Sequence, residues 1–227
     1  MKLNQFFSRK KSMIVGTIVV ALFLSVAMVM AKKNVNTRSM AGKTVYAVFA
    51  NDNTSGLTKA LFDTAVAEFK AQGDRVDELN LYEHASDMPF FEHNRKAMES
   101  HPFYLENKQR FLDADVLLIV FPVYWYSVPG ILKTWIDMLS GWSYKYESGR
   151  YAQPLHKIKQ VFVLYACAQA TSPKNSEGLT AVEFQVSETC KFIGIPDVQI
   201  HGVADVYGLQ SGDAQKHLDA IKKMIRC

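Results

Sequence analysis

The chain has 227 residues, 48% of them hydrophobic and 21% charged, a globular composition that excludes disordered, collagen-like and coiled-coil classes. Its formal charge is +4, but residues 1–40 carry seven bases and no acids, so the remainder holds 19 bases against 22 acids. This slightly acidic remainder lacks the clustered bases of a nucleic-acid-binding domain, and we expect no nucleic-acid partner. Three widely spaced cysteines, Cys167, Cys190 and Cys227, indicate neither a disulfide scaffold nor a structural zinc site.

The N-terminal part contains a long uncharged run. Met13–Ala31 has 19 residues without a charge. As a helix this run is about 28 Å long, close to the ~30 Å hydrocarbon core of a bilayer and longer than the core of an ordinary signal peptide. We therefore predict a single N-terminal transmembrane helix within an anchor at residues 1–31, a polar tether at residues 32–42, and a folded domain at residues 43–227. A cleaved export signal and a mis-assigned start are the alternatives.

From residue 43 onward, apolar β-rich runs alternate with helical periods. Five runs predict strands, at Thr44–Ala50, Arg75–Leu81, Asp115–Phe121, Lys159–Ala166 and Asp197–Asp205. Helical spacing predicts the intervening segments, at Leu57–Ala71, Glu106–Leu112, Gly130–Leu139, Glu177–Ile193 and Asp213–Ile225. This alternation predicts an α/β fold, a doubly wound five-stranded parallel sheet for which the flavodoxin-like order 2-1-3-4-5 is a common solution.

Ligands of such sheets bind beyond the carboxyl ends of the strands, so the loops starting near Asn51, Pro122 and Cys167 are the candidate site. The first of these, Asn51–Thr58, combines hydroxyl side chains with Gly56 at a helix N-terminus, an arrangement suited to a phosphate. Ser55 could instead be an ordinary N-cap. Neither a GxGxxG nor a GxxxxGK[ST] motif is present, which disfavours a dinucleotide-binding Rossmann site and a P-loop.

The second loop is the most informative stretch of the sequence. Three consecutive aromatic residues, Tyr124, Trp125 and Tyr126, lie between Pro122 and Pro129, directly after a fully apolar predicted strand. Prolines stiffen such a loop, and aromatic side chains at a strand's carboxyl end form a flat apolar surface that suits a planar ring.

The stretch PVYWYSVPGILKTWIDMLSGWSYKY, Pro122–Tyr146, closely resembles the flavin-loop signature of the flavodoxin-like NAD(P)H:quinone oxidoreductases. That family includes the potassium-efflux ancillary subunits and the drug-activity-modulator quinone reductases. The resemblance covers almost all of residues 43–227 in pattern, without the N-terminal run. It implies a bound flavin, FMN with FAD as the alternative, and NAD(P)H as co-substrate.

The resemblance also implies which residues hold the flavin. The phosphate would lie at Asn51, Ser55, Leu57 and Thr58. The isoalloxazine ring would contact the backbone and side chains of Pro122, Val123, Tyr124, Trp125 and Tyr126. The family's third flavin loop would be formed by Tyr165, Ala166, Cys167 and Ala168, where the family commonly reads Thr-Thr-Gly-Gly. The Tyr/His pair that mammalian members carry after this loop has no counterpart in residues 169–190, so no catalytic side chain is assigned.

The resulting expectation is an enzyme that transfers a hydride from NAD(P)H to flavin N5 and then to a quinone or similar electrophile, by ping-pong exchange. The alternative is a non-enzymatic flavin-binding subunit of a membrane transporter. The resemblance further implies a homodimer, with Tyr144, Tyr146 and Tyr151 as interface candidates. Because NAD(P)H and flavin are supplied inside the cell, we expect a single-pass membrane protein with a cytoplasmic domain.

Two further groups carry weaker signals. The histidines His84, His93 and His101 lie in the polar stretch Tyr82–His101 without metal-ligand spacing, so an exposed loop is expected and a lid is the alternative. Three cationic or titratable side chains after the second loop are candidates for a nicotinamide nucleotide's phosphate or ordinary surface: Lys145, Arg150 and His156.

Overall fold

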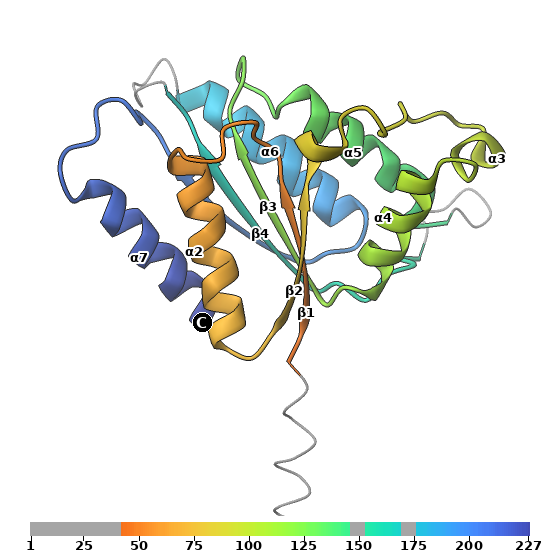
Figure 1. Cartoon of the computed structure of the whole chain (residues 1–227), viewed down its shortest axis with the longest axis horizontal. Coiled ribbons are helices and arrows are strands. Elements are labelled where there is room, and N and C mark those ends of the chain that lie inside the picture. Colours follow the sequence, from red (N-terminus) through yellow and green to blue (C-terminus); the bar gives the residue numbers. More distant parts are fainter. Residues whose placement is uncertain (1–41, 146–152, 169–175) are drawn as a thin grey trace, which may run out of the picture. The chain divides into compact units, whose positions relative to one another are not determined.

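Five parallel strands form the centre of the domain in the computed structural model, which describes residues 42–145, 153–168 and 176–227. The strands are β1 (Thr44–Phe49), β2 (Arg75–Asn80), β3 (Val116–Pro122), β4 (Gln160–Ala166) and β5 (Asp197–Val203). Their order is β2-β1-β3-β4-β5, which confirms the predicted order. All five carboxyl ends lie at one edge of the sheet, the upper edge in Figure 1.

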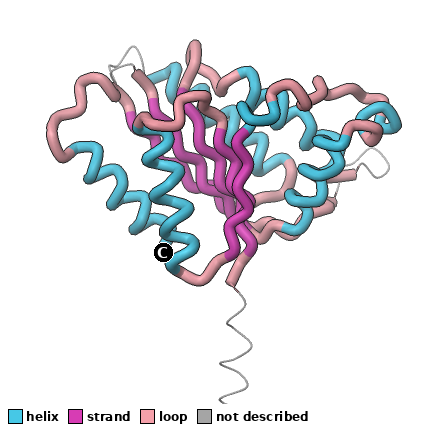
Figure 2. The backbone as a smooth tube through the Cα atoms, in the orientation of Figure 1, coloured by secondary structure: helices cyan, strands magenta, loops and turns pink. Residues whose placement is uncertain are grey.

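Helices cover both faces of this sheet (Figures 1 and 2). One core lies beneath α2 (Leu57–Ala71) and α7 (Asp213–Arg226). The other lies beneath α4 (Pro102–Asp113), α5 (Gly130–Trp142) and α6 (Ser176–Phe192). The central strand β3 is buried from Val116 to Phe121, because its apolar side chains alternate between the two cores.

The first predicted helix agrees with the structure at both ends. It begins at Leu57 and is terminated at Gly73, whose φ of 87° is a left-handed conformation that glycine adopts at little cost. The N–H of Gly73 donates to the carbonyl of Lys70, and the N–H of Asp74 donates to that of Phe69. These two bonds form a Schellman motif, which satisfies carbonyls at the helix end and turns the chain into β2.

The stretch Tyr82–His101 differs from the expected exposed loop. It contains the short helices η1 (Leu81–His84) and α3 (Arg95–Met98). The side chain of Met98 is fully buried, and Phe91 packs against the core beside α5. The segment is thus anchored to the domain by apolar contacts, which its polar composition concealed.

The membrane prediction requires a correction. Within the described parts of the chain, no helix is long and apolar enough to cross a membrane. The longest of them, α6, has 17 residues, where a span needs about 20 predominantly apolar ones. This finding contradicts the expected single-pass localisation with a cytoplasmic domain. The run Met13–Ala31, on which that expectation was based, lies outside the described residues.

Candidate functional site

Three loops meet at the carboxyl ends of β1, β3 and β4, and we call this region the carboxyl edge: residues 50–56, 123–129 and 167–168. Because β1, β3 and β4 are consecutive neighbours in the sheet, their loops lie side by side. The predicted site residues of all three loops are therefore brought to one edge of the molecule.

The first loop is organised by two asparagine side chains. The buried Asn51 accepts a hydrogen bond from the N–H of Asn53 (3.3 Å), and Asn53 accepts from both the N–H and the hydroxyl of Ser55 (2.9 Å each). Ser55 is not the N-cap of α2, since that position is occupied by Gly56.

The N-terminus of α2 is uncapped by any described side chain. Its first N–H groups, at Leu57 and Thr58, have no earlier helical turn to receive them and carry the positive end of a helix of 15 residues. Such an end attracts an anion. The predicted phosphate position lies at this helix end, with Ser55 one residue before the N-cap.

The second loop is a two-residue hairpin with unusual backbone angles. Tyr124 and Ser127 exchange two N–H···O bonds of 3.0 Å, and the two residues between them have positive φ angles, 50° at Trp125 and 59° at Tyr126. Turns of this kind normally use Asn-Gly, because a left-handed conformation costs a side-chain-bearing residue about 1–2 kcal/mol. Two aromatic residues therefore hold backbone strain at this point, as functional sites often do.

The strained turn presents both rings and donors to solvent. The side chain of Trp125 is 95% exposed, while Tyr124 and Tyr126 are 43% and 48% exposed. No described residue accepts a hydrogen bond from the N–H of Trp125 or Tyr126. The N–H of Val123, by contrast, donates to the carbonyl of Ala166 (2.8 Å), which joins the second loop to the third.

The third loop is held by β5 through its backbone. The N–H of Cys167 donates to the carbonyl of Val203 (2.8 Å), and the carbonyl of Cys167 accepts from the N–H of Val206 (3.1 Å). Both hydrogen bonds use backbone atoms only. They therefore do not require the glycines that the family commonly carries where this chain has Tyr-Ala-Cys-Ala.

Tyr165 points to the core rather than to the loop surface. Its ring stacks on Phe121 and lies against Gly202, where a Cβ would come within 2.1 Å of the ring. Its hydroxyl donates to Glu183 of α6 (2.6 Å). Burial, followed by the bond to Glu183, raises the pKa of Tyr165. The hydroxyl is thus a neutral donor that ties α6 to the end of β4.

The second and third loops enclose a pocket of about 210 Å³. Its lining contains five of the predicted site residues: Val123, Trp125, Tyr126, Cys167 and Ala168. The predicted residues Pro122 and Ala166 pair with each other at the ends of β3 and β4, directly beneath these loops. The arrangement is an apolar, aromatic pocket beside an anion-attracting helix end.

Two residues near the carboxyl edge, Asp52 and Tyr82, were not among the predicted site residues. Burial, then the nearby hydroxyl of Tyr124 and the carboxylate of Asp52, raise the pKa of Tyr82. Burial and Asp52 likewise raise the pKa of Tyr124. Tyr82 is the second residue after β2, so a search of the residues beyond the carboxyl end of that strand as well would have found it.

His156 is not placed to meet a nucleotide phosphate. Its side chain is buried, one ring nitrogen lies 2.9 Å from the carbonyl of Ile193, and the ring packs edge-on against Phe111. Burial lowers the pKa of His156, which keeps it neutral. Of its two companions, Lys145 is described, while Arg150 lies outside the described residues.

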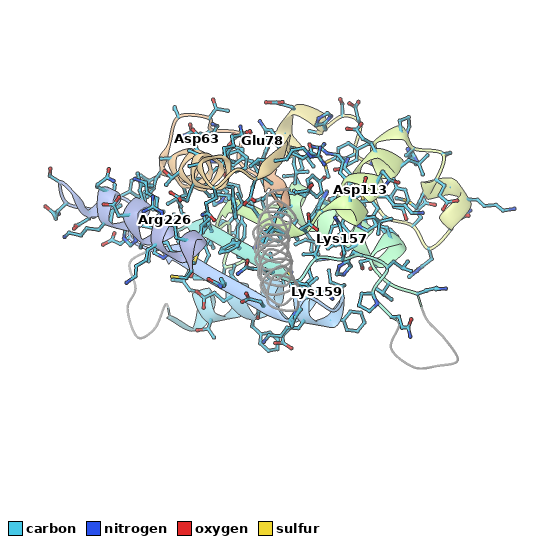
Figure 3. All side chains as sticks on the ribbon, turned by 90° about the horizontal axis from the view of Figure 1, so that it is seen from below. Asp63, Glu78, Asp113, Lys157, Lys159 and Arg226 are labelled. Atoms are coloured by element: carbon cyan, nitrogen blue, oxygen red, sulfur yellow. The ribbon has the colours of Figure 1, made fainter. Side chains whose placement is uncertain are left out.

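A larger hollow, of about 550 Å³, lies at the opposite end of the sheet, which we call the amino edge. Its lining includes Lys43, Asp115, Lys157, Lys159, Gln160 and Asp197. Figure 3 views the molecule from this end and shows the side chains of Lys157 and Lys159 there. Asp115 accepts from the N–H of Thr44 (2.8 Å) and forms an ion pair with Lys157 (2.8 Å). These charged groups already have partners within the chain. Size alone therefore does not identify the ligand site.

Comparison with known proteins agrees with this fold. The profile of the family described as "Flavodoxin-like fold" matches residues 43–225. The "Ribosyldihydronicotinamide dehydrogenase [quinone]" of Rattus norvegicus is 30% identical over 118 residues, covering 43% of this chain and 51% of the rat protein. The "Uncharacterized NAD(P)H oxidoreductase YcaK" of Escherichia coli is 25% identical over 170 residues, covering 71% of this chain and 83% of that protein. The chain thus spans about half the length of the rat relative.

Among solved structures, an FMN-dependent NADH-azoreductase from Bacillus anthracis in complex with FMN superposes with a TM-score of 0.68 at 17% identity, covering 81% of this chain and 98% of that one. At this identity the likeness shows the fold. No similarity supports the transporter-subunit alternative. The family match over residues 43–225 confirms the resemblance seen in Pro122–Tyr146, and this chain belongs to the flavodoxin-like family that includes NAD(P)H:quinone oxidoreductases.

Proposed function

We propose that the chain is an FMN-dependent NAD(P)H:quinone oxidoreductase. The observation that carries this proposal is the aromatic pocket of the second and third loops, at the same edge as the uncapped N-terminus of α2. The names of the relatives support the assignment, since they include a quinone dehydrogenase, an NAD(P)H oxidoreductase and an FMN-dependent reductase.

The donor set of this chain fits FMN. The N–H groups of Leu57 and Thr58 offer a phosphate two donors at the positive end of the helix, and the side chains of Asn51 and Ser55 order the loop before it through their bonds with Asn53. The pocket between Trp125 and Cys167 is lined mainly by apolar and aromatic surface, which suits a planar ring. The N–H groups of Trp125 and Tyr126 remain available to the polar atoms of that ring.

When bound, the flavin supplies the two-electron chemistry by which NAD(P)H is oxidised and a quinone is reduced in turn. The chain's own contribution is binding and orientation. The two hydrogen bonds of the turn fix the backbone that carries Trp125 and Tyr126, so less ordering of this loop is required on binding. The N–H donors of this turn and the end of α2 favour negative charge nearby. No described acid or base is assigned to proton transfer.

Absorption spectroscopy of the purified full chain tests this function. We expect a flavin band near ~450 nm, retained or restored with FMN, that NAD(P)H bleaches and a quinone restores. A colourless protein that neither FMN nor FAD reconstitutes would contradict flavin binding. Reconstitution by FAD alone would replace FMN as the cofactor, and bleaching that no quinone reverses would contradict the reductase.

We further propose that the chain is a homodimer. Tyr144, one of the predicted interface residues, packs edge-on against Phe192 of α6, whose ring is 46% exposed. The other two, Tyr146 and Tyr151, lie outside the described residues. Exposed aromatic rings of this kind are enriched in interfaces. Light scattering on the full chain should give twice the chain mass, and a monomer at micromolar concentration would contradict the proposal.

A further inference from the structure

Two histidines face each other away from the carboxyl edge. His201 belongs to β5 and His217 to the first half of α7. Nε2 of His201 lies 3.1 Å from Nδ1 of His217, and the two rings are inclined at 64° with their centres 5.3 Å apart. Both side chains are half-buried between strand and helix. As a plain hydrogen bond, this pair holds one proton between two nitrogen lone pairs.

The distance between the two nitrogens also suits a metal ion in place of that proton. Two nitrogens bound to a tetrahedral ion at about 2.0–2.1 Å lie about 3.3 Å from each other, so the pair is within a few tenths of an ångström of ligand spacing. We propose that His201 and His217 form a two-histidine site for a borderline divalent transition metal ion such as Zn²⁺ or Ni²⁺. Imidazole nitrogens select such ions over Mg²⁺ and Ca²⁺, which prefer oxygen.

The surroundings define an open site rather than a closed one. Asp213 lies one helical turn before His217, but its carboxylate already pairs with Lys216 (2.8 Å) and accepts from the N–H of Gln210 (3.0 Å). Within the described residues, no group of three or more His, Cys, Asp or Glu side chains could hold a metal. Two ligands therefore come from the chain and the remaining positions from water, which makes the site exchangeable.

A metal ion bound by His201 and His217 would affect the segment that supports the third loop. Two backbone bonds hold Cys167 in place: its N–H donates to Val203 at the end of β5, and its carbonyl accepts from the N–H of Val206 in the segment between β5 and α7. An ion joining His201 to His217 ties the two ends of this segment together. It would thereby stiffen the support of the third loop without entering the pocket.

Metal titration of the tag-free full chain tests the proposal. We expect Zn²⁺ and Ni²⁺, but not Mg²⁺, to bind one ion per chain in competition with a chromophoric chelator, and to raise the thermal midpoint with increasing concentration. Since loss of an outer-shell partner already costs about 10–100-fold in metal affinity, His217→Gln and His201→Gln should each cost at least tenfold. His93→Gln, which removes an exposed histidine, is the matched control and should bind as the unmodified chain does.

Three outcomes would overturn the proposal. The first is a full chain that binds neither Zn²⁺ nor Ni²⁺, a result that needs no variant and so does not depend on any variant folding. The second is unchanged affinity in His217→Gln, a substitution that a half-exposed helix position tolerates. The third is binding that disappears with Cys227→Ser instead, because Cys227 is an exposed thiol. None of these results bears on flavin binding, which has its own test.

Discussion

The two edges of the sheet differ in whether their polar groups have hydrogen-bond or ion-pair partners. At the amino edge, polar groups satisfy one another: Asp115 holds the N–H of Thr44 and the ammonium of Lys157, and Gln160 donates to Asp197 (2.8 Å). At the carboxyl edge, the N–H groups of Trp125 and Tyr126 meet no described acceptor. The amino edge has the larger hollow, yet the carboxyl edge has the strained backbone and exposed rings.

We infer from this difference that the ligand site is indicated by donors and rings left without partners rather than by the volume of a hollow. Strain and exposed aromatic surface lower stability, so they persist where a bound molecule uses them. The charged groups that are paired with each other at the amino edge stabilise the fold and offer few free donors or acceptors to a ligand. Substitutions at the two edges should therefore separate stability from flavin binding.

The largest expected effect comes from filling the space beneath the third loop. In Gly202→Ala the new Cβ would lie 2.1 Å from the ring of Tyr165, which Phe121 and Glu183 hold in place. Overpacking of this kind costs about 1–3 kcal/mol, so we expect a loss of that size in the free energy of unfolding, with weaker FMN binding. Gly130→Ala is the control, because nothing lies within 4 Å of its added Cβ. Equal stability of both variants in urea unfolding would contradict the packing described here.

Relieving the strained turn should move stability and binding in opposite directions. In Trp125→Gly the left-handed conformation no longer costs energy, which should stabilise the fold by up to about 1 kcal/mol after the entropic cost of glycine. Loss of the indole should weaken FMN binding by about 1–3 kcal/mol, the range known for stacking on a protein ring. Trp125→Ala separates the two effects, since it loses the ring and keeps the strain. Unchanged FMN affinity in both variants, measured by fluorescence quenching, would remove Trp125 from the site.

At the amino edge the pattern should reverse. Asp115→Ala removes a partly exposed carboxylate that serves both Thr44 and Lys157, so we expect a loss of about 1–2 kcal/mol in stability and no change in FMN affinity. Asp115→Asn retains an acceptor for the N–H of Thr44 and should lose less. If Asp115→Ala weakened FMN binding as much as Trp125→Gly, the separation of the two edges would be wrong.

The smallest effect is a dependence on pH. Burial lowers the pKa of His156 below its ordinary value of about 6.5, so the unfolded chain takes up a proton first as the pH falls. Its contribution to stability is complete above about pH 6.5 and is lost as the pH falls toward the lowered, folded-state pKa. His156→Gln should flatten this part of the stability–pH curve. An identical acid slope in the variant would assign the effect to other groups.

Much of the fold could be predicted from the sequence because its signals are local and strong. The apolar run predicts β3, the helical period from Leu57 predicts α2, and Gly73 predicts where α2 ends; the structure agrees with all three. The second loop was found in the same way, since its three aromatic residues follow β3 after a single residue, Val123.

What the sequence could not predict depends on contacts between distant residues. Tyr165 turns into the core because Gly202 leaves room for its ring and Glu183 accepts its hydroxyl, and neither partner is near it in sequence. His156 is buried because its ring packs edge-on against Phe111 and its Nε2 lies at hydrogen-bond distance from the carbonyl of Ile193. The membrane prediction failed for a different reason, since it was argued from the length of one uncharged run rather than from a packed element.

Hydrogen exchange with and without FMN tests the central claim most directly, because it locates the ligand on the backbone. Protection should appear in peptides covering residues 51–58 and 122–129, where N–H donors meet no described acceptor, and in 165–168, which ends at the pocket-lining Cys167 and Ala168. Peptides covering residues 113–117 and 155–160, at the amino edge, should exchange as before. Protection confined to the amino edge would contradict the account, and would place the ligand in the larger, charged hollow instead.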